Sequence, residues 1–488
     1  MALSFSEVIE EARQSARALL DYGDHFFNPT VRLGVTGLSR AGKTVFITAL
    51  IHGLTRGGRF PIFEPFATGR IAKARLAPQP DDAVPRFDYE NHVRTLMERR
   101  WPNSTVDISE LRLVIDYQRK NGADRTLTLD IVDYPGEWLL DLPLLNKSYE
   151  QWSAESLSLS RERPRARLAT QWHSHLATLN ALEAEDEQAA LTAARLFTEY
   201  LRTCRDERFA MSLLPPGRFL MPGNLAGSPA LTFAPLDLPD NGAAAEGSLW
   251  AMMRRRYEAY KDVVVRPFFR DHFSRLDRQV VLVDALSAFN SGPEALVDLE
   301  AALAGILDCF RIGRSTLLSS LFRPRIDRIL FAATKADHLH HSSHDRLEAV
   351  LRRTVNRAVA RAENTGADID VVALAAARAT REAQVQRGRE KLPSILGTPA
   401  PGETAGVEAF DGETEVATFP GDLPADPEEL FMGEAAFRGL SSAPAEKSDF
   451  RFLRFRPPQL EREGIDEPVL PHIRLDRALQ FLIGDRLQ

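Results

Sequence analysis

Residues 31–51 read Val-Arg-Leu-Gly-Val-Thr-Gly-Leu-Ser-Arg-Ala-Gly-Lys-Thr-Val-Phe-Ile-Thr-Ala-Leu-Ile, and this stretch decides the fold. Its beginning has the length and apolar character of a buried strand, and the apolar run after Thr44 is long enough to continue as a helix. Between the two, residues 37–44 match the pattern G-x-x-x-x-G-K-T, in which backbone N–H groups and a helix N-terminus surround one anion. The stretch therefore predicts a phosphate-binding loop, and its flanks argue against an ordinary glycine turn.

The loop residues have distinct predicted roles. Gly37 and Gly42 allow backbone angles that a side chain would forbid, so the chain can touch phosphate. Lys43 can reach the β- and γ-phosphates, and the Thr44 hydroxyl can ligate Mg²⁺. The predicted phosphate-binding residues are Gly37, Ser39, Arg40, Ala41, Gly42, Lys43, Thr44 and Val45.

Asp133 supplies the second part of the predicted site. A phosphate-binding loop needs a further carboxylate that holds Mg²⁺ at the end of a neighbouring strand. Residues 127–133 are a strand that ends in this aspartate, and Tyr-Pro-Gly136 follows. Asp-x-x-Gly is also a common turn, but its place at a strand end after the loop favours the metal site. We expect Asp133 to face the metal and the Gly136 N–H to bond the γ-phosphate.

A threonine that covers Mg²⁺ is expected between the first helix and Asp133. We choose Thr105 because it lies just before a predicted strand, with Thr68 as a rival and helix capping as the ordinary role of such a residue. The predicted metal ligands are thus Thr44, Thr105 and Asp133.

Residues 334–337, Thr-Lys-Ala-Asp, follow a predicted strand and indicate selectivity for guanine. The Asp337 carboxylate can accept hydrogen bonds from N1–H and the exocyclic amine of guanine. Adenine lacks both donors and would leave a buried carboxylate unpaired. The Lys335 stem can lie over the base, and the Thr334 hydroxyl can tie the motif to the phosphate-binding loop. A solvated turn is the ordinary alternative.

Two further positions complete the prediction. Ala376 and Ala377 follow the last predicted strand, where GTPases place a turn that backs the base, although alanines are also ordinary helix and core residues. Glu137 stands where many GTPases have a glutamine that orients the attacking water, and its charge would repel the γ-phosphate. Arg99 and Arg100 could neutralise charge near the same loop, although such arginines are more often ordinary surface charge. The predicted catalytic residues are Lys43, Thr105, Gly136 and Glu137.

The strand candidates predict an α/β fold of the Ras-like P-loop NTPase class. Asn121-Gly122 marks a hairpin turn, and helical segments such as 346–363 separate later strands. This alternation is typical of a mostly parallel sheet with helices on both faces. The predicted strands after the loop are 111–117, 126–132, 280–283, 329–333 and 371–374.

Composition shifts divide the chain. Residues 166–206 and 249–276 have helical periodicity, and Pro267 is expected to kink or divide the second stretch. Asp411-Gly412 suggests a small hairpin near the end, and 475–482 suggests a terminal helix. The predicted parts are an amphipathic helix at 1–30 that packs on the core, a nucleotide-binding domain at 31–137 and 278–390, an inserted all-α domain at 138–277, and a small C-terminal extension at 391–488.

The composition fits a multidomain globular protein. Its 488 residues exceed the usual limit of about 250–300 residues for one core, and its apolar content is 44%. A net charge of −7 argues against nucleic-acid binding, and two cysteines cannot build a disulfide framework. The chain shows no secretion signal and no apolar run long enough to span a membrane. We expect a cytoplasmic protein that reaches a membrane only through a partner.

With these residues in place, the chain resembles the YcjX-like family of bacterial P-loop GTPases over nearly its whole length. The resemblance rests on residues 37–50, 130–141, 334–337, 373–382 and 471–485. It implies a GTP/GDP-binding protein with a helical domain added to a Ras-like core. It also implies a link to bacterial stress responses and an inner-membrane protein as partner.

Three functions remain open at this point. The first is a guanine-nucleotide switch that hydrolyses GTP slowly with Mg²⁺ and moves the helical domain. The second is an ATP-using enzyme built on the same loop. The third is a nucleotide-stabilised scaffold with vestigial catalysis, which Glu137 keeps open.

Overall fold

The computed structural model describes residues 29–38, 40–239, 242–309, 326–363, 367–387, 389–405, 408–431, 452–460 and 468–488. Ser39, one of the predicted phosphate-binding residues, lies outside these ranges. Residues 1–28, which include most of the predicted N-terminal helix, also lie outside them.

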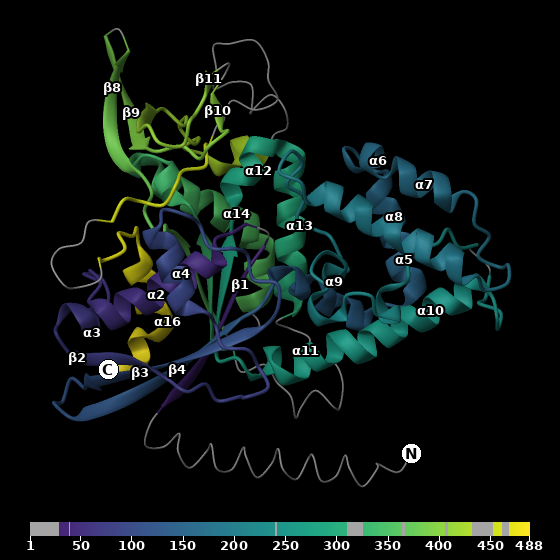
Figure 1. The fold of residues 1–488 in the computed structure, drawn as a ribbon, viewed down its shortest axis with the longest axis horizontal. Coiled ribbons are helices and arrows are strands. Elements are labelled where there is room, and N and C mark those ends of the chain that lie inside the picture. The colour runs from purple at the N-terminus through teal and green to yellow at the C-terminus, as the bar shows by residue number, and fades with distance from the viewer. Residues whose placement is uncertain are drawn as a thin grey trace.

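A seven-stranded sheet forms the centre of the molecule (Figure 1). Its strands are β1 (Thr30–Gly37), β2 (Ile71–Ala77), β3 (Ser109–Gln118), β4 (Asp124–Asp133), β5 (Arg278–Val283), β6 (Arg328–Ala333) and β7 (Asp368–Ala373). Their spatial order is β2-β3-β4-β1-β5-β6-β7. From β4 to β7 every pairing is parallel, whereas β2 with β3 and β3 with β4 are antiparallel. The predicted mostly parallel α/β sheet is confirmed.

The predicted hairpin at Asn121-Gly122 is also confirmed. β3 and β4 pair in antiparallel register from Ser109↔Asp133 to Gln118↔Asp124. At the turn, Gly122 has a φ of 86°, and the Asn121 side chain accepts a hydrogen bond from the Ala123 N–H at 3.1 Å. A left-handed glycine after asparagine is the residue pair that such a turn requires.

Helices cover both faces of the sheet. One face packs on α2 (Lys43–Arg56), α4 (Tyr89–Met97) and α16 (Leu475–Ile483), and the other on α12 (Ala285–Ser291), α13 (Pro293–Cys309) and α14 (His344–Glu363). The short α3 (Glu64–Ala67) follows α2. Successive residues of β5 point to opposite faces of the sheet and pack into the hydrophobic cores on those faces. Val280 and Leu282 face the first set of helices, whereas Val281 and Val283 face the second.

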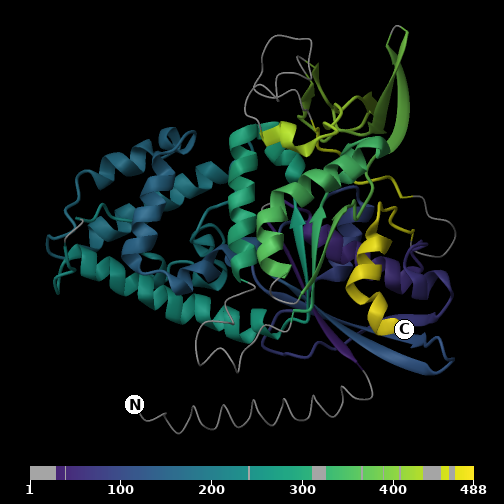
Figure 2. The ribbon, with the colours of Figure 1, turned by 180° about the vertical axis from the view of Figure 1, so that it is seen from behind.

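Residues 138–277 form a block of helices beside the sheet, on the right in Figure 1 and the left in Figure 2. The turn η1 (Gly136–Asn146) leads from the sheet into the block. The helices of the block are α5 (Tyr149–Arg161), α6 (Arg165–Leu168), α7 (Thr170–Leu176), α8 (Glu187–Arg205), α9 (Gly217–Leu220), α10 (Leu249–Tyr260), η4 (Lys261–Val265) and α11 (Arg266–Asp271). One continuous hydrophobic cluster joins the block to the sheet, because it contains Trp152 and Phe197 as well as Val281 and Phe331.

Pro267 lies where the predicted helical stretch 249–276 is divided into separate elements. It lies in the first turn of α11, directly after the π-helical turn η4 that continues α10. Proline is tolerated in the first turn of a helix, because the N–H that it lacks would have no partner within the helix there.

The C-terminal region differs from the prediction at one point. No hairpin forms around Asp411-Gly412, because β11 (Glu408–Ala409) pairs with β10 (Thr404–Ala405), whereas β12 (Val416–Thr418) pairs with β9 (Glu390–Gly397). Asp411 instead caps a local turn by accepting hydrogen bonds from the Glu413 and Thr414 N–H groups. β9 also pairs with β8 (Arg381–Arg387). The division of the chain into domains stays a prediction.

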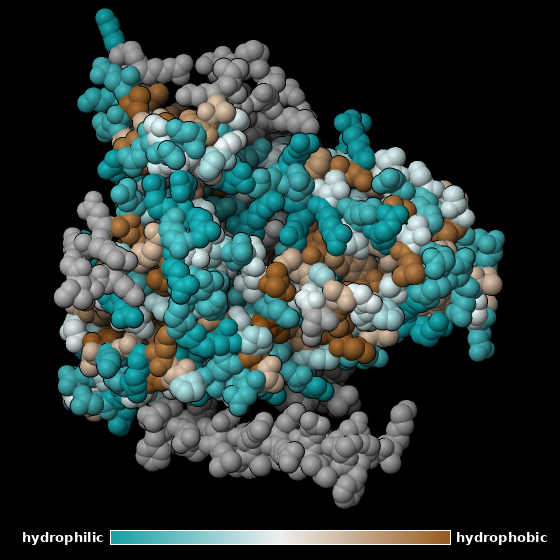
Figure 3. All heavy atoms as spheres, viewed as in Figure 1, coloured by the Kyte–Doolittle hydropathy of each residue, from teal (hydrophilic) through white to brown (hydrophobic). Residues whose placement is uncertain are grey.

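Short helical turns connect the larger elements. They are η2 (Gly223–Leu225), η3 (Pro229–Leu231), η5 (Phe273–Arg275), η7 (Ala336–His338), η8 (His341–Ser343), η9 (Pro427–Phe431) and η10 (Gly484–Leu487). On the face seen in Figure 3, hydrophobic side chains are scattered among hydrophilic ones. Within the described ranges, no helix is both long and apolar enough to cross a membrane.

Candidate functional site: a nucleotide cleft

The phosphate-binding loop connects β1 to α2 as predicted. Gly42 has a φ of 76° and is the last residue before α2, whose first residues are Lys43 and Thr44. Arg40 also has a left-handed backbone, with a φ of 64°. These angles turn the chain tightly around the N-terminus of α2, where backbone N–H groups and the helix dipole favour an anion.

Four predicted side chains meet beside this loop. The Lys43 ammonium forms an ion pair with the buried Asp133 carboxylate. The Thr105 hydroxyl donates to the other carboxylate oxygen, Oδ2, at 2.6 Å, and lies 3.4 Å from the Thr44 hydroxyl. Two hydroxyls and one carboxylate thus converge, which is the type of oxygen donor set that Mg²⁺ prefers. Residues far apart in the sequence therefore meet where the metal site was predicted.

The rival Thr68 lies elsewhere. It is exposed at the C-terminal end of α3, where its hydroxyl donates to the Glu64 carbonyl at 2.7 Å. Its contact is the ordinary capping role, so Thr105 is the better candidate.

Gly136 touches the phosphate-binding loop directly. A Cβ atom added to Gly136 would lie 2.1 Å from the Gly37 carbonyl oxygen, which is far closer than atoms can approach. Only glycine therefore lets η1 begin against the loop. This contact keeps the Gly136 backbone beside the phosphate-binding region, as the sequence predicts.

The helical block supplies an arginine near Glu137. Arg205, at the end of α8, lies with its Nη1 3.6 Å from the Glu137 Oε1, and both side chains line the cleft. Arg99 and Arg100, by contrast, do not line it. Arg99 donates to the Pro457 carbonyl at 3.3 Å, and Arg100 pairs with Glu98 on the surface. Neither arginine lies where it could neutralise charge in the cleft, which agrees with the ordinary role of surface charge.

Three arginines from different parts of the chain face the cleft instead. They are Arg40, Arg205 and Arg454. Glu207 forms ion pairs with Arg40 at 2.8 Å and with Arg454 at 2.9 Å. Partial burial and the neighbouring Arg205 guanidinium lower the pKa of Arg40. Sequence reasoning missed Arg205 and Arg454 because neither lies in a local motif, and only the fold brings them to the loop.

The predicted base-recognition residues lie at the other end of the cleft. Lys335 has a φ of 61°, and its ammonium pairs with the buried Asp284 carboxylate. Burial alone would raise the pKa of Asp284, but the Lys335 ammonium and hydrogen bonds from Ser287 lower it below its ordinary value. Asp284 was missed, although its place directly after β5 is a usable signal. The pair fixes the Lys335 stem along the cleft wall.

Asp337 is buried at this end. Its Oδ2 accepts the Ala379 N–H at 2.8 Å, and its backbone carbonyl accepts the Thr380 hydroxyl. Ala376 and Ala377 line the cleft beside it, as expected of a turn that backs a base. The Thr334 hydroxyl donates to the Val283 carbonyl at 3.3 Å, so it ties the motif to β5 and not to the phosphate-binding loop. That expectation is wrong because β5 lies next to β6 in the sheet.

Both ends open into one cavity of about 470 Å³. This volume lies within the range of about 300–1,000 Å³ that is usual for small-ligand pockets. Its wall includes Lys43, Thr105, Gly136, Lys335 and Asp337. The arrangement provides room for a phosphate chain at one end and a planar ring at the other.

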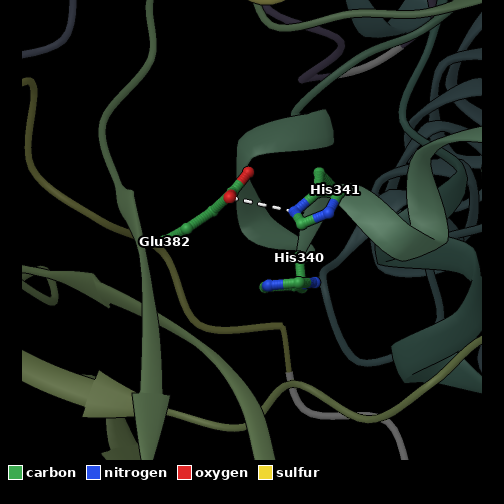
Figure 4. Close-up of side chains that lie close together, drawn as sticks. All are labelled: His340, His341 and Glu382. Atoms are coloured by element: carbon green, nitrogen blue, oxygen red, sulfur yellow. Dashed lines mark hydrogen bonds and ion pairs between the residues drawn. The ribbon is translucent and has the colours of Figure 1, made fainter.

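A second group of side chains lies near the base-recognition loop (Figure 4). Ligand atoms of His340, His341 and Glu382 lie within 4.8 Å of one another at the surface. The His341 Nδ1 is 2.9 Å from the Glu382 Oε2, and this hydrogen bond ties the loop to β8. These side chains are not among those that line the cleft.

Three features together define a P-loop NTPase. They are the glycine loop after β1, the Lys43 and Thr44 side chains at the start of α2, and Asp133 at the end of the adjacent strand. Its sheet order and its helices on both faces agree with that class. Residues 31–487 match the model of the YcjX-like family, DUF463, and the chain belongs to this family.

Two relatives match along almost their whole length. The chain is 36% identical over 477 residues to Ras-like GTPase YcjX of Escherichia coli (strain K12), which covers 94% of this chain and 96% of that protein. It is 34% identical over 489 residues to Ras-like GTPase YcjX of Shewanella oneidensis, which covers 94% of this chain and 95% of that protein. The resemblance drawn from the sequence motifs is confirmed at the level of the family.

Proposed function

We propose that the protein is a guanine-nucleotide switch that binds GTP or GDP with Mg²⁺, hydrolyses GTP slowly and passes the state of the nucleotide to the helical block. The name Ras-like GTPase that its relatives carry supports guanine-nucleotide binding. One observation carries the proposal: Gly136 touches the phosphate-binding loop, and the next residue touches the helical block.

The contact of Glu137 with the helical block is as close as the contact of Gly136 with the phosphate-binding loop. A Cβ added to Gly217, at the start of α9, would lie 1.9 Å from the Glu137 carbonyl oxygen. Two neighbouring residues, Gly136 and Glu137, thus lie between the phosphate-binding loop and the helical block. A γ-phosphate that bonds the Gly136 N–H would move or order this segment, and the block would respond.

The phosphate end supports a role for Mg²⁺. Thr44, Thr105 and Asp133 would hold the metal directly or through water, and Lys43 would contact the β- and γ-phosphates. When bound, Mg²⁺ supplies positive charge that offsets the charge of the phosphates. Residues Gly37–Val45 enclose the phosphates with backbone N–H groups, and the Gly136 N–H reports the third phosphate.

The base end supports guanine. The buried Asp337 carboxylate can accept from N1–H and the exocyclic amine, whereas adenine would leave it without those donors. The Lys335 stem would lie over the base, and Ala376 and Ala377 would back it.

Slow hydrolysis follows from the residue at position 137. A carboxylate near the γ-phosphate repels the anion and positions water less well than an amide. The Arg205 guanidinium, 3.6 Å away, offsets part of that charge. Because Arg205 belongs to α8, the hydrolysis rate would depend on where the helical block sits.

The proposed setting is a bacterial stress response in the cytoplasm, with an inner-membrane protein as partner. This part rests on the family resemblance alone. A deletion strain that grows like its parent under heat and envelope stress would contradict it.

Calorimetric titration of GDP, GTP and ATP in the presence of Mg²⁺, followed by measurement of phosphate release, tests the proposal. We expect GDP and GTP to bind far more tightly than ATP, and GTP to be hydrolysed slowly. ATP binding equal to GTP would favour an ATP-using enzyme. Tight GTP binding without turnover, together with a Lys43→Ala protein that still performs the cellular role, would favour a scaffold.

A variant with altered base specificity makes the test more specific. Asp337→Asn should weaken GDP binding by about 10²-fold or more and improve binding of xanthosine diphosphate, because the amide can donate to the extra carbonyl of xanthine. Asp345→Asn is the matched control, since Asp345 is exposed at the start of α14 and pairs with Arg474. An Asp337→Asn protein that binds GDP normally would refute guanine recognition by this residue.

A further inference from the structure

We infer that Trp101 is an aromatic wall of the nucleotide site that stacks on the nucleoside, and that the C-terminal segment 452–457 holds it in place. The inference rests on the proposed nucleotide-binding function and adds a contact to it. It also assigns a role to a segment that lies far from every nucleotide-binding motif in the sequence.

Trp101 is unusual among the tryptophans of this chain. Its side chain lines the cleft, and the residue is 39% exposed, whereas the other four tryptophans are each at most 4% exposed. The chain reaches this position because α4 ends at Met97 and Arg99 adopts a left-handed backbone with a φ of 56°. A large indole is thus presented to the cleft four residues before Thr105.

The C-terminal segment fastens this indole. The Trp101 Nε1–H donates to the Phe455 carbonyl at 2.7 Å. Arg99 donates to the Pro457 carbonyl at 3.3 Å, and Arg456 donates to the Arg99 carbonyl at 3.4 Å. Three hydrogen bonds therefore join three neighbouring residues of the segment to the end of α4. An exposed side chain that only faced solvent would not need this support.

The same segment reaches the base-recognition end. The Phe455 ring meets the His338 ring edge-on, with centroids 5.3 Å apart, and His338 directly follows Asp337 in the chain. Phe452 exchanges two backbone hydrogen bonds with the Asn290 side chain, at 3.1 and 3.2 Å. Because Phe455 contacts both Trp101 and His338, the indole lies toward the nucleoside end of the cleft.

The chemistry of the indole fits a nucleoside. Every base has a flat π-face, and stacking on an aromatic side chain is worth about 1–3 kcal/mol per base. The N–H of the indole is already used by Phe455, so the ring offers the cleft its apolar face and not a hydrogen bond. A purine that lies next to the Lys335 stem could also stack on the apolar face of the Trp101 indole.

Acrylamide quenching of intrinsic fluorescence in the full-length protein tests the contact. Since the other tryptophans are buried, the accessible fraction of the emission reports Trp101. Saturating GDP should lower that fraction, and Trp101→Phe should remove both the fraction and its response. An accessible fraction that GDP leaves unchanged, in a protein that calorimetry shows to be saturated, would overturn the inference while guanine-nucleotide binding stands. A wild-type protein that binds no guanine nucleotide would overturn both.

Two variants separate stacking from a purely structural role. Trp101→Ala should weaken GDP binding by about 5- to 150-fold, whereas Trp101→Phe, which keeps an aromatic face but cannot donate to Phe455, should stay within about threefold of wild type. If Trp101 only anchors the C-terminal segment, both variants lose the same hydrogen bond and should weaken GDP binding equally. If Trp101→Ala fails to fold, the quenching of the wild-type protein by itself decides.

Discussion

The change Asp141→Asn should make the protein less sensitive to rising pH, because it removes a buried carboxyl at the junction with the helical block. Asp141 is 2% exposed and lies in η1, four residues after Glu137. Its carboxylate accepts hydrogen bonds from the Gly217 N–H and the Tyr260 hydroxyl at 2.6 Å, and from the Arg218 N–H at 3.3 Å. Both α9 and the C-terminal end of α10 are thus tied to this one side chain.

Burial raises the pKa of Asp141 from its ordinary 3.8 to about 6, although the three hydrogen bonds and the Arg218 guanidinium oppose that rise. A carboxyl whose pKa is higher in the folded than in the unfolded protein favours folding at low pH. That contribution is present below pH 3.8 and is lost as the pH rises through about 6.

The magnitude follows from the two pKa values. At pH 8 the folded protein is destabilised by the full difference between them, which is about 3 kcal/mol at roughly 1.4 kcal/mol per pKa unit. At pH 5 only about 1.6 kcal/mol of this has developed, because most folded molecules still hold the proton. Asparagine carries no charge at either pH. The free energy of unfolding of wild type minus that of the variant should therefore fall by about 1.4 kcal/mol from pH 5 to pH 8.

The variant keeps most of the local contacts. Its amide oxygen can accept from Gly217, and the Tyr260 hydroxyl can rotate to accept from the amide nitrogen. Only the long bond from the Arg218 N–H is lost, at a cost of about 1 kcal/mol that does not depend on pH. Such local changes alter the difference in free energy of unfolding by the same amount at pH 5 and at pH 8, so they do not change its pH dependence.

Urea unfolding between pH 5 and pH 8, followed by tryptophan fluorescence and circular dichroism, measures the difference. The two signals must change together for a single free energy to apply. Asp345→Asn is the control, because this aspartate is exposed and its hydrogen bond with Arg474 lowers its pKa, so any effect is small and of opposite sign. A difference between wild type and Asp141→Asn that stays constant or grows with pH would refute a raised pKa at Asp141.

Three other changes test the same region. Gly217→Ala should lower the free energy of unfolding in urea by at least about 2 kcal/mol, because the added Cβ would clash with the Glu137 carbonyl. Gly305→Ala is the control: the added Cβ lies in open space on α13, and the variant should be more stable by up to about 1 kcal/mol. Glu137→Gln should raise the GTP turnover rate by about tenfold, because one repulsion with the γ-phosphate is removed, and an unchanged or lower rate would contradict that reasoning. Arg454→Ala should speed GDP release by less than about fivefold at low salt and not at all at high salt, because its ion pair with Glu207 is half exposed and screened.

Local patterns were enough to predict the elements that surround the proposed phosphate site. The strand, glycine loop and helix around 37–44 are contiguous, so their periodicity and special residues are visible in one window. The same holds for the β3–β4 hairpin, whose turn is marked by Asn121-Gly122. Asp133 and residues 334–337 could be ordered along the site because the carboxyl ends of parallel strands meet at one edge of the sheet.

Other parts depend on contacts that no local window contains. β2 is an edge strand with mostly exposed or half-exposed residues, so it lacks the apolar alternation that predicts a strand. The hairpin expected at Asp411-Gly412 does not form because residues 408–409 pair with β10 and residues 416–418 pair with β9, so the two flanks do not pair with each other. Trp101 lies in a loop, and only its hydrogen bond to Phe455, 354 residues away, shows why the indole faces the cleft.

The packing between the sheet and the helical block constrains how a switch here can work. Because one hydrophobic cluster runs from Val281 and Phe331 to Trp152, the block cannot swing away without exposing core residues. Movement at Gly136 must therefore pass through the contacts that already exist, namely Glu137 against Gly217 and Asp141 against α9 and Tyr260. A shift of α9 and α10 within the packed block satisfies this restriction, whereas a wide opening of two rigid domains does not. Under the proposed function, GTP and GDP should thus change hydrogen exchange mainly at α9 and at the end of α10, and leave α5 to α7 protected alike in both states.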